Sequence, residues 1–179
     1  MSKLINAYRR ILHTYPIIVQ SIQTSMLMSL GDICAQTIIE RKNLGEINLI
    51  RTARFGSLGI ILVGPVCAQW FRFLATTIGT KGSAVALKKV AMDQLLFAPC
   101  MMLVFLTTLN TLERKSWEET QRHIKANYVD IMIANYKVWP AIQLINFYII
   151  PTYYQLLLVQ SIALFWNTYL AWKTARKID

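Results

Sequence analysis

The feature that most limits how this chain can fold is a run from residue 138 to residue 172 that contains no charged side chain. A helix rises about 1.5 Å per residue and about 20 residues cross the apolar core of a bilayer, so this run is longer than one crossing requires. Pro140 and Pro151 lie within it, and proline is favoured in the first turn of a helix but not in its middle. The run therefore predicts a short apolar half-helix over about 140–148, a break, and a full crossing over about 151–172.

The composition supports a membrane protein. The chain is 55% hydrophobic and 16% charged, whereas soluble domains contain about 25% charged residues. A net charge of +10 would suggest nucleic acid as the partner of a soluble protein. Here the basic residues cluster at the ends of apolar segments, where they contact phospholipid head groups. We therefore expect one integral membrane domain over residues 1–179, with the lipid bilayer as a partner and no direct nucleic-acid binding.

Three more apolar segments complete the expected fold, over about 17–39, 49–78 and 85–109. The predicted fold class is all-α, an integral membrane bundle of four transmembrane helices. Amphipathic helices are expected over about 3–15, which is similar to a mitochondrial-type leader, and over about 117–135, where Ser116 is the expected N-cap. The apolar face of the second is expected to carry Trp117, Ile124, Tyr128 and Ile131. Four crossings would place the N-terminus, the 79–83 turn and the C-terminus on one side.

The sequence offers little to catalytic chemistry. It contains no nucleophile spaced with a base, no phosphate-binding loop and no paired-carboxylate site, and His13 and His123 are its only histidines. The three cysteines lack CxxC or Cys/His spacing, so we expect no metal and no cofactor. We interpret them as small buried hydrophobes, with redox sensing as the alternative. The chain is expected not to be an enzyme.

Polar residues inside the apolar segments are the remaining candidates for function. A charged side chain at the centre of a bilayer costs about 2.5–3.5 kcal/mol or more, so it should face a partner or water. Such residues either join helices through buried hydrogen bonds or line an aqueous path. The pore or gating candidates are Asp32, Gln36, Arg54, Gln69, Arg72, Lys89, Asp93, Gln94, Gln143 and Asn146.

Within this set, the two acidic residues are the most constrained. Asp32 and Gln36 are one helical turn apart, and Lys89 and Asp93 have the i, i+4 spacing of a local ion pair. We interpret Asp32 and Asp93 as cation-attracting or gating charges. Their expected partners are Arg54, Arg72 and Lys89.

At these residues the sequence also resembles a known family. The C-terminal part contains Trp139-Pro140, Gln143, Asn146-Phe147, Pro151 and then Trp166-Asn167 with Tyr169-Leu170, and the upstream part contains Gly31-Asp32 with Gln36, Arg51, Gly64-Pro65 with Trp70, Lys89 with Asp93-Gln94, and Phe97-Ala98-Pro99-Cys100. This pattern resembles the Mpv-seventeen family, also called the peroxisomal membrane protein twenty-two kilodalton family, over nearly the whole chain. The strings at 97–100 and 146–148 are most similar to its mitochondrial inner-membrane branch.

The resemblance implies a function as well as a fold. Members are four-span proteins that form or modulate a weakly selective channel for small solutes, affect membrane potential and reactive oxygen species, and maintain mitochondrial DNA and its nucleotide supply. The implied location is the mitochondrial inner membrane, with the peroxisomal membrane as the alternative. Three positions depart from the family pattern: Gln155 stands where arginine is usual, Phe71 where tyrosine is usual, and Ala171 where serine is usual.

Two other functions remain open from the sequence. One is a non-conducting structural or adaptor protein of an inner-membrane complex, which docks through the uncharged run over 138–172 and loses its partner when the small-residue face around Gly56 and Gly59 is enlarged. The other is a carrier that alternates about the broken 140–151 region. The expected partners are small solutes, a homo-oligomer or an inner-membrane complex. We expect the break near Pro151 to mark a constriction, and a helix continuous through Pro151 would contradict this.

Overall fold

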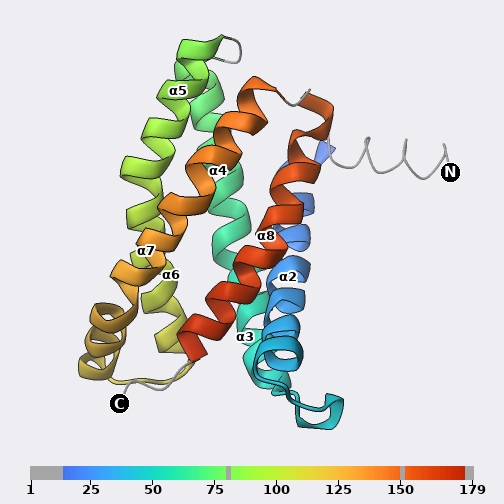
Figure 1. The fold of residues 1–179 in the computed structure, drawn as a ribbon, viewed down its shortest axis with the longest axis vertical. Helices are drawn as coiled ribbons and strands as arrows, with labels where there is room; N and C mark the ends of the chain where they lie inside the picture. Colours follow the sequence, from blue (N-terminus) through green and yellow to red (C-terminus); the bar gives the residue numbers. More distant parts are fainter. Residues whose placement is uncertain (1–13, 80–81, 150–151, 176–179) are drawn as a thin grey trace, which may run out of the picture.

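The computed structural model describes residues 14–79, 82–149 and 152–175, and these are helical almost throughout, without a strand among them (Figure 1). They form five helical rods: α2 (Pro16–Cys34) with the π turn η1 (Ala35–Ile39); α3 (Leu49–Leu58), η3 (Gly59–Val63) and α4 (Gly64–Ile78); α5 (Ser83–Met92), η4 (Asp93–Phe97) and α6 (Ala98–Leu112); α7 (Trp117–Tyr148); and α8 (Thr152–Ala175). The short 3-10 helix η2 (Leu44–Glu46) lies between the first two rods. The predicted all-α class is confirmed. The amphipathic helix expected over 3–15 falls almost wholly outside the described residues.

The rods run alternately in opposite directions along one bundle (Figure 1). Gly56 lies against Ser29 and Gly64 against Ser21, so the second rod is antiparallel to α2. The start of α2, the end of α4 and the start of α5 lie at one end of the bundle, and the end of α8 lies at the other. The described residues thus begin and end at opposite ends of the bundle, whereas the sequence prediction of four crossings placed both chain ends on one side with the 79–83 turn. The reason is that α7 extends along the whole bundle and adds a fifth rod.

The outer surface of the bundle is apolar. Three of the described helices are long and apolar enough to cross a membrane: Pro16–Ile39, Leu49–Ile78 and Ser83–Leu112. Large hydrophobic side chains cover the outside, among them Ile61, Leu95 and Phe165, which are 76%, 75% and 72% exposed. Such exposure would be a liability in water, and it is what a lipid-facing surface requires. The chain is therefore a multi-pass membrane protein.

Two prolines are accommodated inside the second and third rods by π turns. Pro65 and Pro99 are each the second residue after a π turn, η3 and η4, respectively. Proline lacks an N–H, and its ring clashes with the carbonyl one turn earlier in a regular α-helix. A π turn widens the helix and changes which carbonyls are paired, so the rod continues past the proline. Each of these rods has segments of 10, 5 and 15 residues.

Pro140 behaves differently from the prediction. It lies inside α7, which is continuous from Trp117 to Tyr148, so the separate half-helix expected to begin at Pro140 is wrong. A proline inside a helix costs about 3 kcal/mol or more. Contacts along the whole of α7 offset this cost, including an edge-to-face pair between Trp139 and Trp166 of α8, with centroids 6.0 Å apart. The position of the predicted break agrees with the structure, because α7 ends at Tyr148 and α8 begins at Thr152.

The buried face of α7 is polar. Most of its buried residues are polar and recur at multiples of about three or four positions: Thr120, His123, Asn127, Asn135, Gln143 and Asn146, together with the apolar Ile131 and Met132. Of the apolar face expected from the sequence, Ile131 is fully buried but Trp117 is 60% exposed. The exposed residues of α7 include Val129, Ile133 and Leu144. Polar groups within the bundle and apolar groups outside are the reverse of a soluble amphipathic helix, and the exposed residues of α7 also include the charged Arg122, Lys125, Asp130 and Lys137.

Glycine allows the first rod to approach its neighbours closely. A Cβ at Gly59 would lie 2.6 Å from the Cα of Ser25, and one at Gly64 would lie 2.5 Å from the Cα of Ser21. On the other side of α2, a Cβ at Gly31 would lie 2.6 Å from the Cβ of Asn167 in α8. The small residues therefore pack the chain against itself, as in other membrane helix pairs.

Candidate functional site

A cavity of about 270 Å³ lies between the rods. Residues of α2, α4, α7 and α8 line it together with η4 and the first half of α6. Most of its wall is apolar, and Asp93 is the only charged residue among the described residues that line it. The polar side chains on its wall are Gln20, Thr24, Asp93, Gln94, Asn135, Gln143 and Asn167.

Asp93 is held in place by a chain of hydrogen bonds that crosses the bundle. The indole N–H of Trp70 donates to Asp93 Oδ1 at 2.9 Å, and Gln94 Nε2 donates to Asp93 Oδ2 at 2.7 Å. Asn135 Nδ2 donates in turn to Gln94 Oε1 at 2.8 Å. Trp70 stacks on Phe97 with their ring centroids 4.8 Å apart. These contacts fix the carboxylate at the cavity wall and connect α4, η4 and α7.

Farther along α7, two buried amides are incompletely bonded. Gln143 and Asn146 are 3% and 4% exposed, and the side-chain oxygen of each accepts no hydrogen bond from a described residue. A buried acceptor without a donor costs about 1–3 kcal/mol. Gln143 lines the cavity, and Asn146 is not among its lining residues. Water or a ligand in the cavity could supply the missing donor for Gln143.

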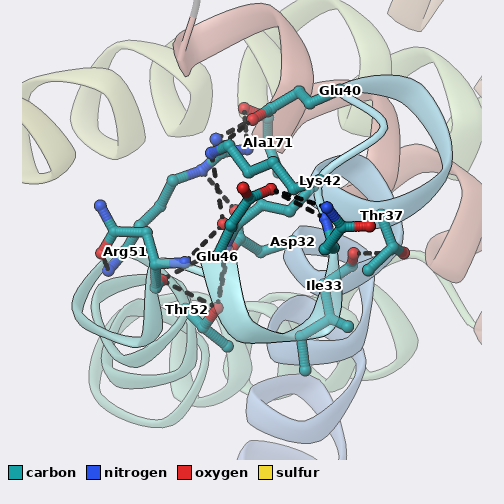
Figure 2. Close-up of polar contacts among 12 residues, drawn as sticks. Asp32, Ile33, Thr37, Glu40, Lys42, Glu46, Arg51, Thr52 and Ala171 are labelled. Atoms are coloured by element: carbon teal, nitrogen blue, oxygen red, sulfur yellow. Dashed lines mark hydrogen bonds and ion pairs between the residues drawn. The ribbon is translucent and has the colours of Figure 1, made fainter.

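Asp32 is part of a second polar cluster, which lies near the opposite end of α2 from the chain start (Figure 2). It is fully buried, and its Oδ1 lies 2.6 Å from Arg51 Nε. Thr52 Oγ1 and Gln36 Nε2 donate to its Oδ2 at 2.6 and 2.8 Å. These contacts compensate the burial of the carboxylate, so Asp32 joins α2 to α3 and is not on the cavity wall.

Arg51 extends this cluster to a third rod. Its Nη2 donates to the backbone oxygen of Ala171 in α8 at 3.1 Å, and its Nη1 donates to Glu40 Oε1 at 2.7 Å. Burial alone would raise the pKa of Glu40, but hydrogen bonds from Lys42 and Arg51 and their positive charges hold its pKa below the ordinary value. One guanidinium therefore holds the ends of α2 and α3 against α8.

His123 makes a third connection at this end of the bundle. Asn110 Nδ2 and His123 Nδ1 are 3.2 Å apart, and His123 Nε2 lies 3.0 Å from the backbone oxygen of Thr174 in α8. Asn110 Oδ1 accepts from Lys115 Nζ at 2.9 Å, so its amide nitrogen faces the imidazole as a donor. His123 must then accept at Nδ1 and donate from Nε2, which is the neutral form.

The cavity contains only part of the candidate set from the sequence. Asp93, Gln94 and Gln143 line it, as do the signature residues Gly64, Trp139, Trp166 and Asn167. Among the other candidates, Asp32, Gln36 and Lys89 are buried away from its wall, Arg54 is partly exposed, and Gln69 and Arg72 are exposed. The side chain of Phe147, residue Pro151 and the side chain of Gln155 are outside the described part of the chain.

The cationic partner of Asp32 is Arg51, which the sequence indicates only as a signature residue, and not the expected Arg54 or Arg72. Asn127 and Asn135 were not singled out, although the four-residue spacing from His123 onward was a signal for a common helix face. Among the described residues, no group of three His, Cys, Asp or Glu side chains could hold a metal ion.

The fold and the cavity define a class: an all-helical, multi-pass membrane protein with a polar site inside its bundle. Comparison with known proteins gives the family. A model described as "Mpv17 / PMP22 family" matches residues 110–171. "Mitochondrial inner membrane protein Mpv17" of Xenopus laevis is 40% identical over 173 residues, which is 97% of this chain and 98% of that protein. The chain belongs to the Mpv17 / PMP22 family.

Other relatives agree with this assignment. The human protein with the same name is 41% identical over 170 residues, covering 95% of this chain and 97% of the relative. "Protein SYM1" of Gibberella zeae is 40% identical over 174 residues, covering 96% and 98%. No solved structure matches the chain. With relatives named for the mitochondrial inner membrane and three apolar helices of its own, the chain is a multi-pass protein of that membrane.

The first prediction concerns the buried ion pair. Arg51→Met leaves Asp32 charged and unpaired, so it should lower the free energy of unfolding by about 3–5 kcal/mol. Arg54→Met is the matched control, because Arg54 lies one turn along the same helix and is partly exposed; its effect should be below about 1 kcal/mol. Thermal unfolding of the purified protein measures both. Equal melting temperatures for the two variants would show that the pair does not hold the fold.

The second prediction concerns pH. Burial, and next the charge of Lys115, lower the pKa of His123 below its ordinary value of 6.5, against the opposing effects of the Thr174 oxygen and Glu113. The unfolded chain therefore binds the proton more readily than the folded protein. The contribution of His123 to stability is complete above pH 6.5 and is lost as the pH falls from there toward the lowered pKa.

Melting temperatures between pH 7.5 and 5.5 would measure this effect. His123→Gln should remove the part of the acid-induced loss of stability that comes from this residue. His13→Gln, the variant of the only other histidine, leaves His123 in place and should keep the full loss. An unchanged pH profile for His123→Gln would contradict the assignment.

Proposed function

We propose that this protein forms or modulates a weakly selective channel for small solutes in the mitochondrial inner membrane. The observation that carries the proposal is the polar face of α7, which points into a bundle whose outside is apolar. Polar side chains inside a membrane are costly, and they are found where they line a path or join helices. Here Asn135 and Gln143 of that face lie on a cavity wall beside Asp93.

The proposal includes the path of the chain through the membrane. The family resemblance implied four spans, and the bundle supports five. α8 starts at the same end of the bundle as α2, so the chain must return from Trp117 to Tyr148 along α7 (Figure 1). The 22 residues from Asn127 to Tyr148 extend about 33 Å, enough for one crossing. The first residues of α7, including His123, would lie beyond the bilayer core.

In this proposal the described conformation is a closed one. The cavity is bounded on one side by Met28, Met102, Phe105 and Leu170, which belong to the main hydrophobic core. Beyond them, Arg51 holds α2, α3 and α8 together. Conduction requires this apolar layer to open, as in channels that are gated by a hydrophobic constriction. Asp93 would then favour cations over anions at the cavity.

The cellular roles in the proposal follow from such a channel. Regulated leakage of small solutes across the inner membrane would affect the membrane potential and, through it, the formation of reactive oxygen species. By its family resemblance, the protein would also contribute to mitochondrial DNA maintenance and nucleotide supply. Homo-oligomer formation and association with an inner-membrane complex are compatible with the proposal.

An adaptor function receives less support from the structure. The small residues whose enlargement was expected to release its partner, Gly56 and Gly59, are buried against Ser25 and Ser29 of α2. A face already used within the chain is not open to a partner. Saturable uptake of one specific solute would indicate a carrier, not a channel.

The third prediction tests the channel. In planar bilayers, Asp93→Asn should lower the K⁺ to Cl⁻ permeability ratio by about fivefold, because a charge at 4 Å is worth about 1 kcal/mol even in water. Glu118→Gln is the matched control, since Glu118 is an exposed acid outside the cavity. Identical single-channel records for wild type and Asp93→Asn would contradict the role of Asp93. Absence of conductance from the purified protein would contradict the channel.

A further inference from the structure

The cavity combines one acidic side chain with aromatic walls. Asp93 is its only charged residue, and no lysine, arginine or histidine is among the described residues that line it. The aromatic residues on the wall are Phe71, Phe97, Phe105, Trp139 and Trp166. Aromatic faces attract cations, and the attraction is stronger where water is excluded. The wall therefore favours a positively charged ligand with apolar groups and disfavours an anion.

Hydrogen-bond acceptors point to the same ligand chemistry. Each oxygen of Asp93 accepts one described hydrogen bond, from Trp70 or Gln94, and a carboxylate oxygen can accept two. Gln143 Oε1 is buried on the wall and accepts no hydrogen bond from a described residue. Asp93 can therefore accept a further donor from within the cavity, and Gln143 Oε1 lacks one among the described residues. An ammonium group supplies N–H donors together with positive charge.

The cavity also limits the size of the ligand. Its volume of about 270 Å³ is below the usual range of sites for drug-sized molecules. It extends on α2 from Gln20 to Met28 and on α8 from Val159 to Leu170, which corresponds to about 12–16 Å along the helix axes. A short chain with a charged end fits this shape better than a nucleotide does.

From these observations we propose that the cavity binds a small organic ammonium ion, with its nitrogen at Asp93 and its apolar part between the aromatic residues. This names the class of solute for the proposed channel and in that sense rests on the proposed function. Gln143 would accept a hydrogen bond from a second donor on a longer ligand. The ammonium could belong to a free amine or to the head group of phosphatidylethanolamine.

Three probes of one length and different charge test the proposal: butylammonium, 1-butanol and butyrate. Calorimetric titration into the full-length protein in phosphatidylglycerol nanodiscs, with empty nanodiscs as the blank, measures their binding. Butylammonium should bind at least tenfold more tightly than either other probe. Equal binding of butylammonium and butanol would identify an apolar site only, and tighter binding of butyrate would reverse the charge assignment; either result overturns the proposal.

Variants locate the binding. Asp93→Asn should weaken butylammonium binding at least tenfold, whereas Asp93→Glu should retain it within threefold. Gln143→Leu is a second variant that we expect to fold, because the oxygen that it removes accepts no hydrogen bond from a described residue. It should weaken binding of 1,4-diaminobutane more than binding of butylammonium. Glu118→Gln should bind both amines as wild type does. Binding that is unchanged in folded Asp93→Asn would overturn the proposal.

Two further comparisons complete the test. Phosphatidylethanolamine added to the nanodiscs should compete with butylammonium if the lipid head group is the natural ligand, and should not compete if a free amine is. Conductance in bilayers without selective amine binding would overturn the ammonium site, while the proposed channel function would still be supported. Selective binding without conductance would support the ammonium site and contradict the channel.

Discussion

The arrangement of this bundle depends on how one buried carboxylate is compensated. Asp32 is completely buried, and an unpaired charge there would be too costly to keep. Arg51 supplies the opposite charge, and Thr52 and Gln36 supply hydrogen bonds. Because Arg51 also donates to the Ala171 oxygen, satisfying Asp32 places α3 and α8 on either side of α2. The close packing of Gly31 and Gly59 follows from this placement.

The rest of the polar interior can be understood from the same requirement. At one end of the bundle, Arg51 and His123 both contact backbone oxygens in the last turns of α8, and Arg51 is also ion-paired with Asp32. Toward the other end, the polar groups of α7 border a cavity, and Gln143 keeps an oxygen without a described donor. Satisfied groups hold helices together, whereas the free oxygen of Gln143 is what the proposed ligand would contact. In this proposal, the groups that join helices and the groups that face a ligand are separated along the bundle axis.

The sequence was sufficient for some of this account. Low charge and long apolar segments predict a helical membrane bundle, and the cost of an intramembrane carboxylate predicts that Asp32 has a partner. The sequence does not show that the partner of Asp32 is Arg51 and not Arg54, because that depends on where α3 begins relative to α2 along the bundle. The proline rule failed at Pro140, where packing on both sides of α7 outweighs a missing hydrogen bond. The four-residue spacing of His123, Asn127, Ile131 and Asn135 continues to Gln143 and would have indicated one helix.

We propose that α7 crosses the membrane with its polar face inside the bundle, so that the two ends of the described chain lie on opposite sides. Single cysteines at Gly45, Ser83 or Ala175, in a chain without its native cysteines, test this most directly. An impermeant maleimide is added to one side of the reconstituted protein in membranes of fixed orientation. We predict that residue 175 is labelled from the same side as residue 45 and from the opposite side to residue 83. Labelling of residues 175 and 83 from one side would contradict the account.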